Sequence, residues 1–356
     1  SPGRMTLDAS VSSSHTAPYE LVRQMRASYY VLGPLVARKG LAEVSLPGGC
    51  AIGQRAIDLH LKGISMLGAE IAISRGYIYA RSSGRLTGRD INLTGTCGSS
   101  VGATMNMMMA SSLARGKTVL HGVAREPEVV DLARMLNLMG ARIEGAGNGG
   151  TITIEGVVSL RGADYKVIPD RIEAGTLAVA AAITGGDLLI SGCRPEHLEA
   201  PLEVLERSGV MIESSDDGLR VSSQLPLKPF SLETEPYPGF PTDMQAQFCA
   251  LATQARGTSQ VTETIFENRF MHVSELVRMG ARMQASGNTV TITGPSKLSC
   301  APVMASDLRA SAALVLAALV AEGTSEINRI YHLDRGYEAL EIKLSRLGAK
   351  ILRVSG

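Results

Sequence analysis

The sequence predicts an α/β fold in two domains, built from a repeated unit with the order helix, strand, helix, strand, strand. Three observations lead to this prediction. The chain has 356 residues, which is more than one hydrophobic core usually supports. A short signature centred on a glycine recurs about every 70 residues. Segments with helical periodicity alternate with short segments rich in β-branched residues, as is typical of α/β proteins.

Each copy of the signature places a glycine directly after a segment with helical periodicity, such as residues 128–139. We therefore expect each glycine to end a helix in the left-handed conformation. Four of the glycines are followed by two short strands around a turn, as at residues 70–73 and 77–79. The five glycines are separated by 72, 69, 71 and 68 residues and are Gly68, Gly140, Gly209, Gly280 and Gly348.

A second helix begins 34 to 41 residues before each of these glycines. These helices are almost entirely apolar, as residues 177–183 and 310–321 illustrate. A helix without a polar face is expected to be buried on all sides. Each then leads through a glycine turn into a strand, as in residues 115–120 and 322–327. We therefore expect the helices to lie inside each domain and the sheets outside.

The repeats predict two domains of three units each. Residues 169–356 hold three units, whereas residues 1–168 hold two complete units. Residues 3–7 resemble the closing strand of a unit, which suggests that five of six units are present and that most of an N-terminal unit is missing. The alternative is that residues 1–18 are an expression tag or a disordered tail.

Composition excludes several classes of protein. A net charge of +1 with 45% apolar and 19% charged residues argues against nucleic-acid binding and disorder. The apolar run 310–321 is too short to span a bilayer and no signal peptide is visible, so we expect a cytoplasmic protein without membrane partners. The cysteines form no Cys-x-x-Cys pair, which argues against a disulfide framework and a zinc site. They are Cys50, Cys97, Cys193, Cys249 and Cys300.

The segment 46–60 has the composition of a mobile catalytic loop. Pro47 and two glycines surround Cys50 with little side-chain bulk, and Arg55 follows shortly after. A neighbouring cation favours a cysteine that acts as an acid or a nucleophile. The alternative is that Cys50 is a small buried hydrophobic residue.

Five motifs together resemble the UDP-N-acetylglucosamine 1-carboxyvinyltransferases, the MurA family of enolpyruvyl transferases, from about residue 4 to the C-terminus. The resemblance implies a two-domain inside-out α/β barrel like that of EPSP synthase, with the active site in the cleft between the domains. It implies transfer of the enolpyruvyl group of phosphoenolpyruvate to the 3′-hydroxyl of UDP-N-acetylglucosamine, the first committed step of peptidoglycan synthesis, without a cofactor or a metal. The motifs lie at residues 46–55, 240–247, 266–272, 306–310 and 334–337.

The resemblance assigns the binding of phosphoenolpyruvate to four arginines. This substrate carries a carboxylate and a phosphate close together, and guanidinium groups bind both groups in bidentate fashion. Arg309 also begins a buried helix, whose free backbone N–H groups are expected to favour an anion. Any one arginine taken alone could equally be a solvated surface charge. The four are Arg55, Arg269, Arg309 and Arg335.

Two residues carry the chemistry that the resemblance implies. Asp243 corresponds to the acidic residue at the sugar hydroxyl and is the candidate base, although it could also cap the helix that follows. Cys50 corresponds to the loop cysteine of the family, which acts as the general acid at C3 or forms a covalent adduct and is alkylated by fosfomycin. An acid on a closing loop protonates carbon after water has been excluded.

The resemblance also assigns contacts to the nucleotide sugar. The backbone amides of residues 100–102 open a helix and are candidates for the diphosphate. Ala56 stands where the family usually has proline, and residues 96–99 are lengthened and lack the basic residue of the family, so Cys97 is interpreted as incidental. The assigned contacts are Arg26, Arg55, Ala56, Ile57, Asp58, Leu59, Ser100, Val101, Gly102, Asp243 and Ile265.

The missing N-terminal unit carries the Lys-Asn pair of the family, which engages phosphoenolpyruvate and has no match in this sequence. We therefore expect this chain alone to be inactive or unstable. Two other functions remain open. The chain could be a related transferase that uses another acceptor alcohol, or an impaired homologue that binds a nucleotide sugar or regulates an intact paralogue.

Overall fold

The computed structural model describes residues 3–11, 14–23, 26–46, 57–96 and 98–354, with only the backbone of Arg26. The described chain divides into two compact units, of which unit 1 ends at Lys166 and unit 2 begins at Val167. No helix in these residues is long and apolar enough to cross a membrane.

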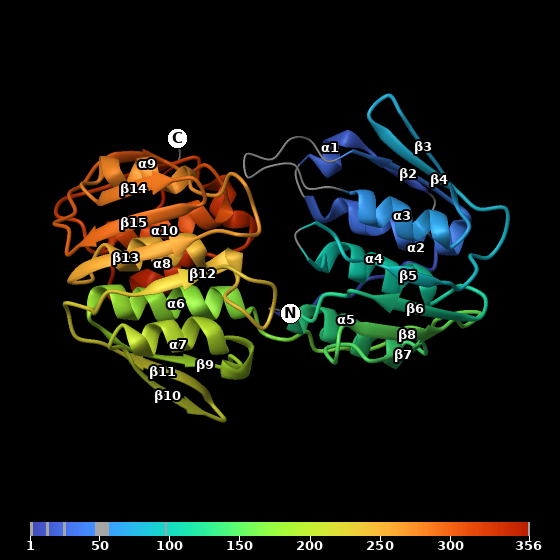
Figure 1. The fold of residues 1–356 in the computed structure, drawn as a ribbon, viewed down its shortest axis with the longest axis horizontal. Helices are drawn as coiled ribbons and strands as arrows, with labels where there is room; N and C mark the ends of the chain where they lie inside the picture. Colours follow the sequence, from blue (N-terminus) through green and yellow to red (C-terminus); the bar gives the residue numbers. More distant parts are fainter. Residues whose placement is uncertain (1–2, 12–13, 24–25, 47–56, 97, 355–356) are drawn as a thin grey trace. The chain divides into compact units, whose positions relative to one another are not determined.

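Unit 1 contains two four-stranded sheets with the strand orders β1-β2-β4-β3 and β5-β6-β8-β7. Figure 1 shows α2, α3 and α4 between these two sheets. The strands are β1 (Thr16–Ala17), β2 (Leu41–Ser45), β3 (Glu70–Ser74), β4 (Tyr77–Arg81), β5 (Asp90–Asn92), β6 (Lys117–His121), β7 (Arg142–Glu144) and β8 (Thr151–Glu155). The helices are α1 (Tyr19–Val22), the 3-10 helix η1 (Arg26–Val31), α2 (Leu32–Lys39), α3 (Asp58–Met66), α4 (Val101–Ser111) and α5 (Pro127–Leu138).

Unit 2 contains sheets with the strand orders β10-β11-β9, β12-β13-β15-β14 and β16-β17. Its strands are β9 (Asp187–Ser191), β10 (Met211–Ser215), β11 (Gly218–Ser222), β12 (Ser231–Glu233), β13 (Gly257–Thr262), β14 (Arg282–Ser286), β15 (Thr289–Gly294), β16 (Pro302–Met304) and β17 (Glu326–Asn328). Its helices are α6 (Arg171–Thr184), α7 (Glu199–Arg207), α8 (Gln245–Ala252), α9 (Met271–Arg278), α10 (Leu308–Ala318) and α11 (Leu340–Arg346), with the 3-10 helices η2 (Pro195–His197), η3 (Thr242–Met244) and η4 (Ile330–Arg335).

The predicted order of elements is confirmed, for example in the run α4, β6, α5, β7, β8. The structure adds a short edge strand that the sequence did not indicate. Four such short strands each pair in parallel with the next strand in the chain: β1 with β2, β5 with β6, β12 with β13 and β16 with β17. The apolar helices are buried as expected. All eight residues of α8 are buried, and α6, α8 and α10 contact one another inside unit 2. Each fully buried leucine or isoleucine side chain there stabilises the fold by about 1.5–3 kcal/mol.

The repeated glycines end their helices in the conformation that the sequence predicted. All five have φ between 95° and 102°, where a Cβ atom is strained. The next residue donates its N–H to the carbonyl five positions earlier, as from Ala141 to Leu136 and from Val210 to Leu205. This is the Schellman motif. The signature carries alanine or valine at that next position because its side chain then packs into the core, with Ala141 and Val210 both buried.

Candidate active site

In unit 2 the structure brings together three of the residues that the sequence singled out, Asp243, Arg269 and Arg309. Asp243 lies in η3, directly before α8, while Arg309 lies in the first turn of α10. Arg269 donates from Nη2 to Asp243 Oδ1 at 2.5 Å, and Arg309 donates from Nη2 to Asp243 Oδ2 at 3.5 Å. One carboxylate therefore bridges two guanidinium groups. Met244, not Asp243, occupies the N-cap position of α8.

The three groups differ in exposure. The side chain of Arg269 is 3% exposed and that of Arg309 is 13% exposed, whereas that of Asp243 is 40% exposed. Nε and Nη1 of Arg269 are buried and have no hydrogen-bond partner among the described residues. Burial lowers the pKa of Arg309, but the negative charge of Asp243 and the Tyr337 hydroxyl raise this pKa above its ordinary value on balance. Arg309 therefore stays charged, and Arg269 keeps two buried N–H-bearing nitrogens that no described residue uses.

The start of α10 differs from the expectation that its free N–H groups attract an anion. Asp307 is the N-cap, and its Oδ1 accepts from the backbone N–H groups of Arg309 at 2.9 Å and Ala310 at 3.0 Å. An aspartate at this position satisfies the first donors of the helix and interacts favourably with its dipole. The expectation of free N–H groups is therefore wrong for Arg309 and Ala310, because the carboxylate of Asp307 already accepts from both.

The buried hydroxyl of Tyr337 lies within hydrogen-bond distance of side chains from three helices of unit 2, α6, α8 and α10. Arg309 Nη1 and Gln247 Nε2 both lie 3.3 Å from this oxygen, and Thr176 Oγ1 lies at 2.9 Å. Thr176 donates to the carbonyl of Ile172, so its oxygen can accept the Tyr337 proton. Gln247 also donates to the backbone carbonyl of Asp243 at 2.9 Å. The network therefore holds both Arg309 and the Asp243 backbone.

His272 is a buried neutral group beside the cluster. Burial lowers its pKa from 6.5 to about 4, although the charge of Asp307 partly opposes this shift. Its Nε2 has no hydrogen-bond partner among the described residues. A neutral imidazole adds no third positive charge next to Arg269. The charges of the cluster are therefore those of the two arginines and of the carboxylates of Asp243 and Asp307.

In unit 1 the structure places Asp58 and Leu59 at the start of α3, and Val101 and Gly102 at the start of α4. The two helices contact each other. Residues 100–102 open α4, as the sequence predicted, and Ser100 caps this helix by accepting from the N–H of Ala103 at 3.3 Å. These expected contacts to the nucleotide sugar therefore lie on two neighbouring helix starts.

A buried histidine joins these helix starts. His60 Nδ1 lies 3.0 Å from Asn106 Nδ2, and the orientation of that amide is fixed because Asn106 Oδ1 accepts from the N–H of Gly33 at 2.8 Å. Burial lowers the pKa of His60 to about 4, so the ring is neutral and accepts at Nδ1. Its hydrogen is therefore on Nε2, which faces Gly102. A Cβ atom on Gly102 would lie 3.0 Å from this nitrogen and 3.2 Å from the Tyr29 hydroxyl.

The remaining site residues make no described side-chain hydrogen bond to the two groups or lie outside the described residues. Arg335 is exposed at the end of η4, and among the described contacts it makes no hydrogen bond to Asp243. Ile265 is half-buried in the turn after β13, and Ile57 is half-buried before α3. Arg26 begins η1. Cys50, Arg55, Ala56 and Cys97 lie outside the described residues.

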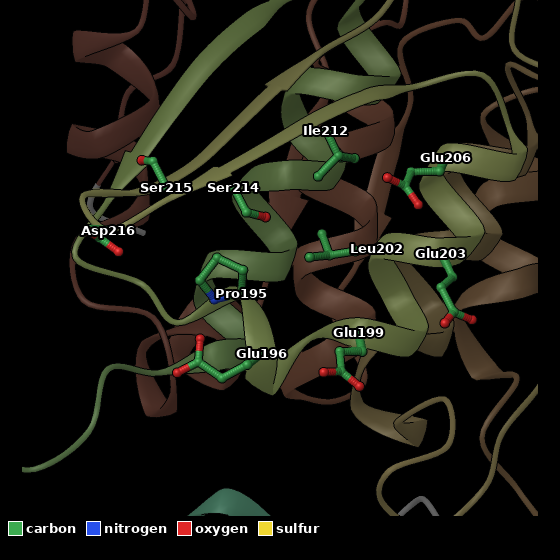
Figure 2. Close-up of a pocket in the computed structure, with 10 residues that line it drawn as sticks. All are labelled: Pro195, Glu196, Glu199, Leu202, Glu203, Glu206, Ile212, Ser214, Ser215 and Asp216. Carbon is green, nitrogen blue, oxygen red and sulfur yellow. The ribbon is translucent and has the colours of Figure 1, made fainter.

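Figure 2 shows a pocket of unit 2 that contains none of the predicted site residues. It has a volume of about 540 Å³ and lies between α7 and β10. Four glutamates and Asp216 line it, so it repels the anionic substrates that the sequence implied. No group of three or more histidine, cysteine or acidic side chains in the described ranges could hold a metal ion. The three-residue cluster, rather than the pocket, is therefore the better candidate for the chemistry.

Sequence reasoning did not assign roles to Tyr337, Gln247, Thr176 or Asp307, which surround the cluster. The available signal was a polar residue inside a helix expected to be buried, as with Gln247 in α8. Such a residue needs a buried partner. The identity of that partner depends on contacts between distant segments, such as the 90 residues that separate Gln247 from Tyr337.

The chain matches the family model of EPSP synthase (3-phosphoshikimate 1-carboxyvinyltransferase) over residues 3–344. It is 58% identical to the UDP-N-acetylglucosamine 1-carboxyvinyltransferase of Granulibacter bethesdensis (strain ATCC BAA-1260 / CGDNIH1), over 96% of this chain and 80% of that protein. It is 56% identical to the protein of the same name from Chelativorans sp. (strain BNC1), over 96% and 79%. Among solved structures, the enolpyruvyl transferase NikO from Streptomyces tendae is similar, with a TM-score of 0.85, 27% identity and coverage of 96% and 81%.

The expectation that most of an N-terminal repeat is missing is not borne out by these matches, in which the family model covers residues 3–344 and this chain spans 79% and 80% of the two curated relatives. The comparisons give no support to the alternative of an impaired homologue. They identify the fold as that of the enolpyruvyl transferases.

Proposed function

Since this chain belongs to the EPSP synthase family of enolpyruvyl transferases, we propose that it transfers the enolpyruvyl group of phosphoenolpyruvate to the 3′-hydroxyl of UDP-N-acetylglucosamine and releases phosphate. The proposal includes a role in peptidoglycan synthesis, and hence in cell shape and division, in the cytoplasm. Relatives at 56% and 58% identity carry the name of this activity.

The observation that carries the proposal is the bridge of Asp243 between Arg269 and Arg309. Two charged guanidinium groups in a largely buried setting suit a substrate with a carboxylate and a phosphate. Among the described residues the buried Nε and Nη1 of Arg269 have no hydrogen-bond partner, and a bound anion is the partner that we propose for them. We assign Arg55 and Arg335 to the same substrate.

In the proposed reaction Asp243 acts as the base. It accepts the proton of the sugar hydroxyl while that oxygen bonds to C2 of phosphoenolpyruvate, and an acid adds a proton to C3. A base then removes a proton from C3, the double bond re-forms, and the C2–O bond to phosphate breaks. The guanidinium groups of Arg269 and Arg309 balance the negative charge of the departing phosphate.

Cys50 is the proposed acid at C3 and the proposed site of alkylation by fosfomycin. The nucleotide sugar is assigned to the helix starts of α3 and α4 in unit 1, together with Arg26, Asp243 and Ile265. A helix start with a serine N-cap offers backbone N–H groups to a diphosphate.

The test is the release of phosphate by the purified chain from phosphoenolpyruvate with UDP-N-acetylglucosamine. We expect release when both substrates are present and none with either alone, together with a carboxyvinyl product detected by mass spectrometry. Other acceptor alcohols in competition measure the acceptor specificity. Phosphate release at the single-substrate background would refute the proposed function.

Fosfomycin provides a second test that reports on one residue. We expect it to abolish turnover and to add one covalent adduct to the peptide that contains Cys50. The Cys50→Ala variant should form no adduct, while Cys249, which is fully buried and whose pKa burial raises, should stay unmodified in both proteins. An adduct on any other cysteine would contradict the assignment.

A further inference from the structure

Glu263 is a buried carboxylate that none of the steps above uses. It follows β13 directly and is 2% exposed. Its two oxygens accept four hydrogen bonds. Oε1 accepts from Thr234 Oγ1 at 2.9 Å and from the backbone N–H groups of Ile265 and Phe266 at 2.8 and 3.1 Å, and Oε2 accepts from Thr242 Oγ1 at 2.8 Å.

These four donors come from three segments that meet at the ends of two parallel strands. Thr234 follows β12, while Ile265 and Phe266 form the turn after β13. Thr242 begins η3 and is the residue before Asp243. One buried carboxylate therefore connects the proposed base, through its neighbour, to the turn that holds a proposed contact of the nucleotide sugar.

The pattern of hydrogen bonds at this position suits a carboxylate better than an amide. All four partners of Glu263 are donors, and a carboxylate offers acceptor sites on both oxygens. A glutamine that keeps its amide oxygen at the Oε1 position would donate from its NH₂ group to Thr242 Oγ1, so the bond on the side of Asp243 would be reversed and would join two neutral groups. Hydrogen bonds to a charged acceptor are also about twice as strong as those between neutral groups.

We infer that Glu263 is a positioning residue for the enolpyruvyl transfer, which holds Asp243 and the turn at Ile265 in the arrangement that the reaction needs. The inference rests on the proposed function. Its mechanism is indirect, because Glu263 fixes Thr242 and thereby the backbone of η3. Displacement of a reacting group by about 1 Å can reduce a rate about 100-fold, and Asp243 must keep its carboxylate within reach of both Arg269 and the sugar hydroxyl.

Two threonines allow a matched experiment, because each donates one hydroxyl to the same carboxylate. Thr242→Val removes the bond on the side of Asp243, and Thr234→Val removes the bond on the side of β12. Thr234 Oγ1 also accepts from the N–H of Thr264 at 2.9 Å, so removing this hydroxyl leaves that N–H without its acceptor as well. A purely structural role of Glu263 therefore predicts that Thr234→Val is the more harmful change for every property.

The positioning role predicts a different order. We expect Thr242→Val to reduce kcat about 10- to 100-fold with both KM values within about threefold, and Thr242→Ser to restore kcat to within about threefold of the wild type. We expect Thr234→Val to keep kcat within about threefold, although its urea midpoint falls at least as far as that of Thr242→Val. Equal losses of kcat in the two valine variants, or unchanged kcat in Thr242→Val, would overturn the inference.

Amide hydrogen exchange separates this inference from the proposed function. We expect faster exchange at residues 242–244 in Thr242→Val and wild-type exchange there in Thr234→Val. This readout needs no turnover, so an inactive wild-type protein would refute the proposed function and leave the exchange comparison valid. Unchanged exchange in Thr242→Val would show that Glu263 does not hold η3.

Discussion

Replacing Asp243 with asparagine removes the charge that bridges the two arginines while keeping the shape of the side chain. The amide oxygen of the new side chain could still accept a hydrogen bond from Arg269. The expected loss in the free energy of unfolding is therefore the difference between a charge-assisted and a neutral hydrogen bond. That difference is about 1–2 kcal/mol. This loss of stability is smaller than that for a broken buried ion pair, because the side chain of Asp243 is 40% exposed while that of Arg269 is 3% exposed.

The same removed charge has the opposite effect on a bound anion. Inorganic phosphate then no longer competes with a carboxylate for Arg269 and Arg309. A gain of about 1–2 kcal/mol corresponds to about 5- to 30-fold tighter binding. Turnover, in contrast, should fall about 100- to 10,000-fold, because the proposed base is absent. Asp243→Asn is therefore expected to bind phosphate more tightly while it loses activity and some stability.

Three measurements test this expectation: phosphate release, urea denaturation and calorimetric titration with inorganic phosphate. Asp187→Asn is the matched control. It removes the same charge from the exposed ion pair between Asp187 and Arg220, at 2.7 Å in the same unit. The control should leave phosphate binding and activity unchanged. Unchanged phosphate affinity in Asp243→Asn, or an equal change in the control, would refute the assignment of the cluster as an anion site.

Three further predictions concern the surroundings of the sites. Tyr337→Phe keeps the ring but removes the hydroxyl that Arg309 contacts. We expect the free energy of unfolding, measured by urea denaturation, to fall by about 1–3 kcal/mol and the KM for phosphoenolpyruvate to rise. An unchanged KM would contradict this role of the hydroxyl. His60 and His272 have folded-state pKa values of about 4, below the unfolded value of 6.5, so the stability that each contributes is complete above pH 6.5 and is lost as the pH falls toward 4. Between pH 7 and pH 5 each histidine should lower the free energy of unfolding by about 2 kcal/mol. His272→Gln should therefore remove about half of the combined loss, which urea denaturation at the two pH values measures. Gly140→Ala places a Cβ at φ 102° in open space, so backbone strain alone should lower stability by about 1–2 kcal/mol, and an unchanged melting temperature would argue against the left-handed turn.

The sequence predicted those parts of the fold that depend on local properties. The conformation of Gly140 follows from its place after a helical segment, and the burial of α8 follows from its apolar composition. The edge strand β12 was not predicted because it has three residues and depends on pairing with β13. Short strands carry too little periodicity to be recognised.

The candidate site shows the same division. Asp243 and Arg309 were identified from their motifs, and the structure brings them together. The capping of α10 by Asp307 changed the expected role of its N–H groups, although Asp307 lies in the same motif. The network at Tyr337 could not be predicted, because each of its bonds joins residues far apart in sequence. A side chain's partner is decided by tertiary packing, which a motif does not describe.

The Schellman turns also bear on how the chain folds. Each turn uses hydrogen bonds that span five residues or fewer, whereas the sheets pair strands such as β6 and β8, whose partners range from His121 with Thr151 to Lys117 with Glu155 and are 30 to 38 residues apart. Contacts close in sequence form with little loss of chain entropy and so form early. The turns at Gly68, Gly140, Gly209, Gly280 and Gly348 are thus suited to act as five separate starting points for folding, each fixing the direction of the chain before its sheet is assembled.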